Sequence, residues 1–267
     1  MSKWGSCVRS RARSARGLWF VAPCLMAILI LWMNGPAWVQ AHGDENAPSV
    51  RVASDIAWTH ETIKLAYGGD PFRGLLLARR CGHCHGTEGF SAEPTVPNLA
   101  GVDRLSLWKQ LQDFRSGKRR SPVMEPMAAL LSSQDSADVA AYFSMLPTFA
   151  DPQDNRTFPQ TMADRTRVPM ARKLVTFGDG SRGIPPCQAC HGPVAFAKGA
   201  PSLSTQNASY ILKQLEHFSD GTRSNDINVV MREIARHLSP EERAALSQYY
   251  GAGLSATNQG PAAPISP

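Results

Sequence analysis

Apolar residues recur three or four positions apart through much of the chain, which is the spacing of one face of an α-helix. The pattern is clearest over residues 105–114 and again over residues 211–218. No alternating apolar run of strand length stands out beside these segments. The pattern therefore predicts an all-α fold.

Capping signals mark the starts of three helices. Each signal places a short polar residue before a proline or three positions before an acidic residue, and so satisfies backbone N–H groups of the first turn. The signals are Asp70 before Pro71, which predicts a helix to Arg80; Ser132 with Asp135; and Ser239 with Pro240 and Glu242, which predicts a helix to Tyr250.

The amino terminus has the three-part layout of a secretory signal. A basic stretch from Lys3 to Arg16 precedes an apolar run over residues 18–33, and small residues before Ala41 mark a cleavage site. A retained membrane anchor is the alternative, although a helix of this run spans about 24 Å, less than the roughly 30 Å hydrocarbon core. We expect residues 1–41 to be a signal peptide. The mature protein is then periplasmic, either soluble or loosely associated with the membrane.

Composition and charge describe a globular body that nucleic acid would not attract. The 267 residues are 43% hydrophobic and carry a formal charge of +6. Five basic residues lie in the first 41 positions, which leaves 23 Lys and Arg against 22 Asp and Glu in the rest. Because nucleic-acid binding needs clustered positive charge, this nearly neutral body argues against such a partner.

All four cysteines beyond residue 41 fall in two C-x-x-C-H motifs. The first is CGHCH at residues 81–85, and the second is CQACH at residues 187–191. This motif attaches c-type haem, because two thiols can bond to the vinyl groups while the histidine binds the iron. We expect two covalent haems c, attached through Cys81, Cys84, Cys187 and Cys190, with His85 and His191 as iron ligands.

Other uses of these cysteines fit less well. A redox-active cysteine pair belongs at a helix start in a βαβ unit, and no strand pattern lies near either motif. Structural zinc needs the two pairs roughly 15–20 residues apart, whereas the motifs here begin 106 residues apart. Disulfide frameworks belong to short chains. The motifs therefore favour haem.

The sequence around the two motifs repeats. The repeated positions, first copy before second, are Pro97 and Pro201, Gln110 and Gln214, Phe114 and Phe218, Gly117 and Gly221, Arg119 and Arg223, and Met124 and Met231. The repeat indicates two modules with one haem site each.

The repeat also sets the domain boundaries. We expect the first module over residues 67–147 and the second over residues 171–251. A proline-rich linker at 148–170 joins them, and a flexible tail follows at 252–267. An amino-terminal extension over residues 42–66 has no counterpart before the second module, and the sequence assigns it no role.

Each iron needs a sixth ligand or an open face, and this choice decides the function. Met124 and Met231 stand 39 and 40 residues after the histidines of their modules. Their equivalent positions predict that both bind iron, which favours the reduced state and excludes small molecules. Met127 competes with Met124, but the second module has Ile234 in its place, which favours a packing role for Met127.

Two further pairs of residues are candidates for holding the haem and its histidine. The carbonyl groups of Pro97 and Pro201 are placed to accept the proton of the ligating histidines and so to fix their rings. Arg119 and Arg223 face either haem propionates or solvent, and the sequence leaves both possibilities open.

These residues together resemble the dihaem cytochrome c4 family of bacterial periplasmic electron carriers. The matching segments are 84–86, 97–101, Gly117, Met124 and 141–143 in the first module, and 183–193, 212–215, Phe218, Gly221, 223–226, Met231 and 238–241 in the second. The resemblance spans residues 68–250. It implies two tandem class I cytochrome c domains, His/Met iron in both, and electron delivery to a terminal oxidase or between redox enzymes.

The resemblance has two departures. The family commonly has Leu-Ala-Gly-Gln after the proline, whereas this chain has Val102 at the last of these positions in the first module and Leu-Ser-Thr-Gln at 203–206 in the second. The segment 42–66 is extra.

Three functions remain open on the sequence. The favoured one is a non-enzymatic periplasmic carrier that moves single electrons between redox partner proteins. The second is the cytochrome subunit of a membrane-associated dehydrogenase or oxidase complex. The third is an enzyme: a dihaem peroxidase would need an open iron face, and a thiosulfate-oxidising cytochrome would need a cysteine ligand, for which no cysteine is spare beyond residue 41.

Overall fold

The computed structural model describes residues 53–148, 162–192, 198–204 and 206–255. Within these ranges the chain forms helices and turns, and its one β-type contact is an isolated bridge between Asp179 and Ile184. The all-α prediction is therefore confirmed. No helix in the described ranges has the length and apolarity needed to cross a bilayer.

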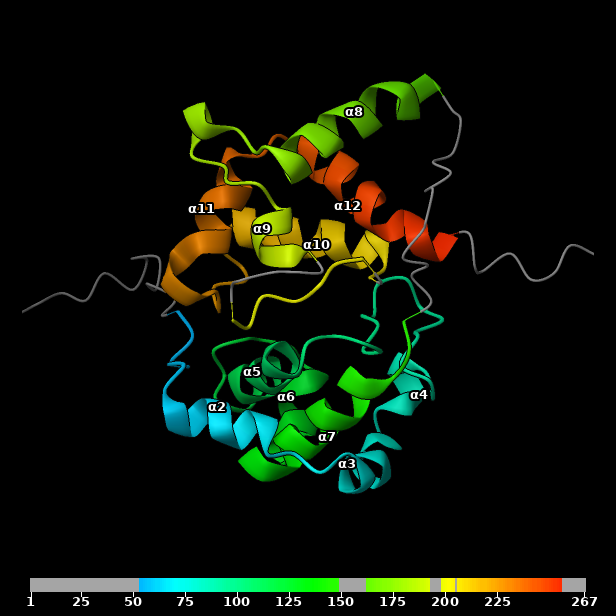
Figure 1. The fold of residues 1–267 in the computed structure, drawn as a ribbon, viewed down its shortest axis with the longest axis vertical. Coiled ribbons are helices and arrows are strands. Elements are labelled where there is room, and N and C mark those ends of the chain that lie inside the picture. The colour runs from blue at the N-terminus through cyan, green and yellow to red at the C-terminus, as the bar shows by residue number, and fades with distance from the viewer. Residues whose placement is uncertain (1–52, 149–161, 193–197, 205, 256–267) are drawn as a thin grey trace, which may run out of the picture. The chain divides into compact units, whose positions relative to one another are not determined.

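The first module is built around its last helix (Figure 1). Helix α7 packs against α2, α3 and α5, while α6 packs against α5. The helices of this module are α2 (His60–Tyr67), α3 (Pro71–Ala78), α4 (Gly82–His85), α5 (Arg104–Arg115), α6 (Met124–Ala129) and α7 (Ser133–Met145).

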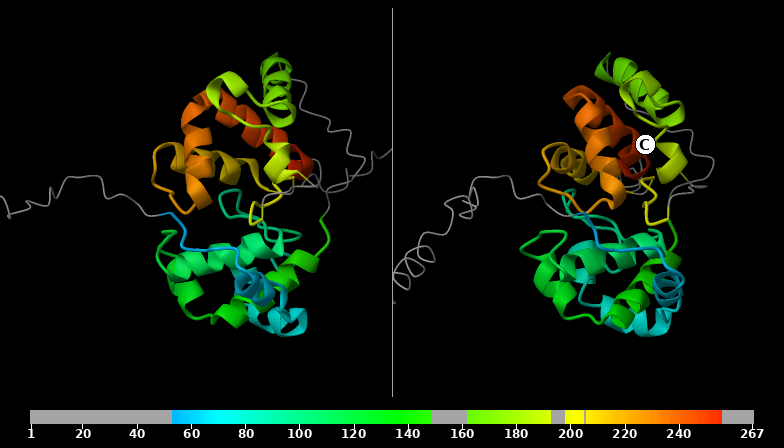
Figure 2. Two further views of the ribbon diagram at one scale, coloured as in Figure 1. Left: turned by 60° about the vertical axis from the view of Figure 1, so that its left-hand side comes forward. Right: turned by 90° about the vertical axis from the view of Figure 1, so that its left-hand side faces the viewer.

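The second module repeats this plan. Helix α12 packs against α8 and α10, and α10 packs against α11, as the two views of Figure 2 also show. The elements are α8 (Met162–Thr176), η2 (Gly180–Arg182), α9 (Gln188–His191), α10 (Ala208–Ser219), η3 (Ile227–Val229), α11 (Val230–His237) and α12 (Pro240–Ser255).

The three predicted helix starts are confirmed. The Asp70 carboxylate accepts a hydrogen bond from the backbone N–H of Phe72 at 2.8 Å. Complete capping boxes open the last helix of each module, one between Ser132 and Asp135 and one between Ser239 and Glu242. Two helix ends differ from the prediction, since α3 stops at Ala78 and α12 continues to Ser255, past Tyr250 into the predicted tail.

The predicted linker is partly helical. Helix α8 begins at Met162, inside the segment 148–170 that its prolines marked as a linker, and it contains Pro169. Proline lacks the N–H that a helix interior uses, so sequence composition argues against a helix here. Packing overrides this preference, because Ala171 and Leu174 on the same helix are buried in the core of the second module.

The described part of the amino-terminal extension belongs to the first module. Ile56 and Trp58 pack against the buried cluster that contains Leu105 and Trp108, and the rings of the two tryptophans lie 6.4 Å apart. The Ser54 hydroxyl donates to the Asp113 carboxylate at 2.6 Å. Residues 53–59, called the strap below, therefore cover α5.

The contact between α3 and α7 predicts a strict requirement for glycine at position 74. A Cβ added at Gly74 would clash with the carbonyl oxygen of Asp138 in α7. We expect Gly74→Ala to lower the free energy of unfolding by about 1–3 kcal/mol, the usual cost of overpacking, measured by urea unfolding of the haem-loaded protein. Gly180→Ala is the control, since nothing lies within 4 Å of its added Cβ. Equal stabilities of the two variants would contradict the close contact.

Candidate haem centres

Each C-x-x-C-H motif forms one turn of helix. The His85 N–H donates to the Cys81 carbonyl at 2.9 Å, and the His191 N–H donates to the Cys187 carbonyl at the same distance. A helical turn places residues three apart on one face, so the two thiols of each motif point the same way. Among the described residues no three His, Cys, Asp or Glu side chains cluster as around a metal ion.

A backbone carbonyl orients the histidine of each motif, as the sequence predicted. The Nδ1 atom of His85 lies 2.7 Å from the Pro97 carbonyl oxygen, and the Nδ1 atom of His191 lies 2.8 Å from that of Pro201. With Nδ1–H donating to the carbonyl, Nε2 is left free for a metal. Burial lowers the pKa of both histidines below its ordinary value, which favours the neutral imidazole that metals bind.

The candidate methionines begin equivalent helices. Met124 is the first residue of α6, and its backbone N–H donates to the Ser121 hydroxyl at 3.1 Å. Met231 lies in the first turn of α11, after a turn in which Asn228 and Val229 adopt positive φ angles of 55° and 62°. A β-branched residue rarely adopts this conformation, so the second module holds its methionine after a strained turn.

One cavity of about 1930 Å³ contains the candidate residues of both modules. Binding pockets for single ligands measure roughly 300–1,000 Å³, so this volume suits two large cofactors. Met127 and Ile234 also line it at equivalent positions, which suits apolar contact with a bound group. The eight predicted site residues on its wall are Cys81, Cys84, His85, Met124, Cys187, Cys190, His191 and Met231.

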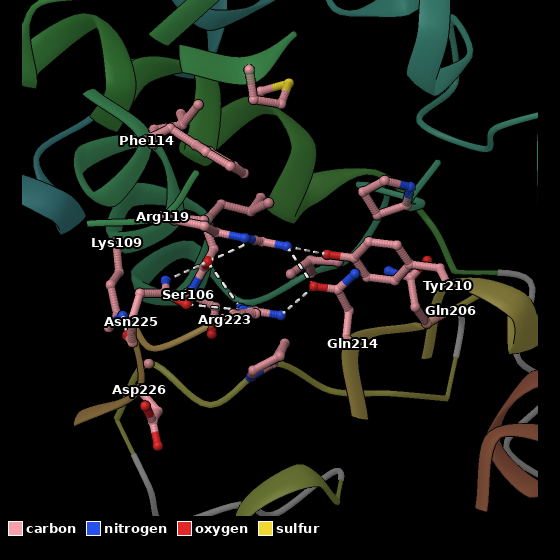
Figure 3. A pocket seen from close by; sticks show the side chains of 18 of the residues that line it. Ser106, Lys109, Phe114, Arg119, Gln206, Tyr210, Gln214, Arg223, Asn225 and Asp226 are labelled. Carbon is pink, nitrogen blue, oxygen red and sulfur yellow. Dashed lines mark hydrogen bonds between the residues drawn. The ribbon is translucent and has the colours of Figure 1, made fainter. Parts of the chain in front are cut away.

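A reciprocal hydrogen-bond network joins the two modules at this cavity (Figure 3). Arg119 donates to Oε1 of Gln110 at 2.7 Å and of Gln214 at 2.9 Å. Arg223 donates to the same two atoms, at 2.8 Å for Gln214 and 3.1 Å for Gln110. Gln110 and Gln214 are equivalent in the repeat, and so are Arg119 and Arg223. The arginine of each module therefore contacts the glutamine of the other, as in a two-fold interface.

The two arginines bring positive charge to the cavity wall. Each guanidinium lies over an aromatic ring, Arg119 at 4.6 Å from the centre of Phe114 and Arg223 at 4.4 Å from that of Phe218. Burial, and after it the charge of Arg119, lower the pKa of Arg223 to about 9. Two close cations are costly unless an anion offsets them, so the cavity wall suits a ligand with carboxylates, and both residues line it instead of simply facing solvent.

Other contacts between the modules have no counterpart in the repeat. The buried Lys109 ammonium donates to the Asp113 carboxylate at 2.5 Å and to the Asn225 carbonyl at 2.6 Å. The second module has His217 in place of Asp113, so this ion pair forms on one side only.

A second one-sided contact comes from a departure in the family motif. The Gln206 side chain accepts from the Asn98 N–H at 2.8 Å and donates to the Asn98 carbonyl at 3.0 Å. The equivalent residue of the first module is Val102, which has no amide with which to return the contact.

Comparison with known proteins identifies the family. The cytochrome c domain family matches residues 73–147. A cytochrome c4 from Pseudomonas aeruginosa is 39% identical over 186 residues, which cover 68% of this chain and 87% of that protein. The chain belongs to the cytochrome c4 family. A cytochrome c domain implies covalently bound haem c, and relatives in this family carry electrons.

Two further relatives agree with this assignment. A thiosulfate dehydrogenase electron acceptor from Stutzerimonas stutzeri is 38% identical over 176 residues, covering 65% of this chain and 78% of that protein. The crystal structure of reduced recombinant cytochrome c4 from Pseudomonas stutzeri matches with a TM-score of 0.59 and 35% identity, covering 69% of this chain and 98% of that one. The predicted fold class, two tandem class I cytochrome c domains, is confirmed.

Several residues that line the cavity of this cytochrome c4-family chain were not among the predicted site residues. Gln110 and Gln214 repeat at equivalent positions, so the repeat carried a signal for them. Tyr210 carried none, because the first module has Ser106 in its place. Its hydroxyl accepts a hydrogen bond from Arg119 at 2.8 Å.

The reciprocal network predicts strong coupling between the two glutamines. Gln110→Ala and Gln214→Ala each leave partly buried guanidinium donors without an acceptor, so we expect each to lower the free energy of unfolding by about 1–3 kcal/mol. The double variant should cost clearly less than the two single variants added together, because both remove acceptors from the same arginines. Chemical unfolding of the three haem-loaded variants measures this, and strictly additive losses would contradict a shared network.

Proposed function

We propose that this protein is a periplasmic carrier that moves single electrons between redox partner proteins through two haems c. The proposal rests chiefly on one observation. Each module brings a C-x-x-C pair, an oriented histidine and a methionine to the wall of one large cavity.

The predicted ligands divide between two irons. We assign His85 and Met124 to the first and His191 and Met231 to the second. A bound haem supplies the one-electron change of iron between its ferrous and ferric states. The proline carbonyls fix the histidine rings. Met124 and Met231 would supply a thioether to each iron, which would favour the ferrous state and exclude peroxide or oxygen.

Arg119 and Arg223 are assigned to the haem carboxylates. Support comes from their place on the cavity wall and from the lowered pKa of Arg223, which an adjacent anion would raise again. The same residues bond the modules to each other, so binding of the cofactor and pairing of the modules depend on one set of side chains.

Location and partners rest on the sequence and on the relatives. The signal-like segment 1–41 supports export. One relative is named as the electron acceptor of a thiosulfate dehydrogenase. This supports a dehydrogenase of that kind as the donor, with transient contact through a small interface.

Two measurements on the purified protein test this function. Intact mass should show a chain beginning after Ala41 with two covalent haems, and titration should show two reversible one-electron steps. A mass with fewer than two haems, or rapid turnover of peroxide by the purified protein, would contradict a two-haem carrier.

The methionine assignment makes a separate prediction. In the oxidised protein, Met124→Leu and Met231→Leu should each remove one part of the weak long-wavelength absorption that reports iron–sulfur bonding, and should lower one midpoint potential. Met127→Leu is the matched control, because Met127 lines the same cavity and should leave both bonds intact. Loss of the band in the control instead of in Met124→Leu would reassign the first ligand.

A further inference from the structure

Large apolar side chains are exposed on one side of α3, the helix that precedes the first haem-binding motif. Phe72 is 80% exposed, Leu76 61% and Leu75 43%. Together with the exposed Arg79 they stand three or four positions apart, so they share one face of the helix, while its other side packs against α7. The α3 face, as it is called below, consists of Phe72, Leu75, Leu76 and Arg79. Large apolar side chains that are exposed together mark an interaction site.

The fold itself does not require apolar residues at these positions. Helix α8 holds the same place in the second module, because it precedes the second motif and packs against α12 as α3 packs against α7. Its apolar residues Leu174 and Val175 are buried, and Arg172 and Lys173 are exposed beside them. The apolar α3 face is therefore a property of the first module alone.

The α3 face adjoins the cavity without being part of it. None of its four residues lines the cavity, whereas Arg80 and Cys84, a few positions further along the chain, do. The backbone continues as a turn from α3 into the motif, since the Cys81 N–H donates to the Ala78 carbonyl at 2.9 Å. A haem in the first module would thus leave the face uncovered, and a protein bound to the face would lie beside that haem.

The charge of the face indicates the chemistry of its partner. Arg79 and the neighbouring Arg80 are exposed and form no ion pair with another of the described residues. Arg73 of the same helix is already paired, with Asp135 at 3.2 Å and Asp138 at 3.3 Å. The unpaired charge beside the apolar side chains is therefore positive, and acidic side chains around an apolar centre would complement it.

We propose that the α3 face docks a redox partner protein whose contact surface is apolar at its centre and acidic at its rim. The proposal rests on the carrier function above and assigns the first module as the one that exchanges electrons with this partner. Its place beside the haem site favours a redox protein over a lipid surface or a second copy of the chain, neither of which needs to approach a haem. A small apolar patch with charge at its edge also suits the brief encounters of electron transfer.

The test follows electron transfer from the reduced two-haem protein to a purified blue-copper protein with an acidic surface. Each event oxidises one ferrous iron to ferric and reduces one cupric ion to cuprous. In stopped-flow measurements at low salt, Phe72→Ser and Leu76→Ser should each lower the second-order rate constant about fivefold. Arg79→Gln should lower it at low salt and have little effect at high salt, where the charges are screened.

The second module supplies matched controls. Phe177 is 75% exposed there, and Arg172 is exposed on α8. Phe177→Ser and Arg172→Gln remove the same chemical groups from the surface of the other module, so both should leave the rate constant unchanged. Because all of these side chains are exposed, the variants should fold and bind haem as the unmodified protein does.

Several results would overturn the docking face. They are unchanged rates in Phe72→Ser and Leu76→Ser, equal falls in Phe177→Ser, or a rate for the unmodified protein that does not fall as salt is added. Two other occupants are tested directly. Sedimentation with anionic phospholipid vesicles that Phe72→Ser abolishes, with its electron-transfer rate unchanged, would make the face a membrane surface. A dimer in analytical ultracentrifugation that Phe72→Ser dissociates would make it a contact between copies.

Haem content and both midpoint potentials are measured first. Fewer than two haems in the unmodified protein would contradict the proposed function. Two haems with unchanged potentials, together with unchanged rates in the variants of the α3 face, would contradict the docking face alone.

Discussion

The shared placement of Arg119 and Arg223 is the constraint on which the arrangement of the two modules depends. Two guanidinium groups on one cavity wall repel each other, and burial removes the water that would screen them. The glutamines beside them supply neutral acceptors, which satisfy the N–H groups without cancelling the charge. A dianionic cofactor in each module would cancel it. The same contacts that pair the modules therefore favour an occupied cavity.

The sequence determined most of the helices and the chemistry of the site. Helical spacing and capping boxes placed α5, α7, α10 and the start of α12, because these signals act within a few residues. The repeat identified the two cysteine motifs in the sequence, and in the structure Cys81 and Cys187 line one cavity. The proline carbonyls were found for the same reason, since Pro97 and Pro201 hold equivalent positions.

The features that the sequence could not predict depend on contacts between distant segments. Helix α8 forms through a proline-rich stretch because Leu174 is buried in a core assembled from the whole second module. The sequence assigned no role to the strap because its partners, such as Asp113, lie more than fifty residues away. Tyr210 and Gln206 act across the two modules at positions where the repeat is broken. A local pattern carries no information on such contacts.

Some equivalent positions of the repeat carry different residues in the two modules. These differences affect how a protein with two haems could use two similar modules. Identical modules would give two irons the same surroundings and no preferred direction of transfer. Here the Lys109–Asp113 pair, the Gln206 side chain and the strap each act on one side only. Hydrogen bonds and fixed charges around a haem set its potential. The reciprocal arginine network joins the modules, and the one-sided contacts make the surroundings of the two predicted haem sites different.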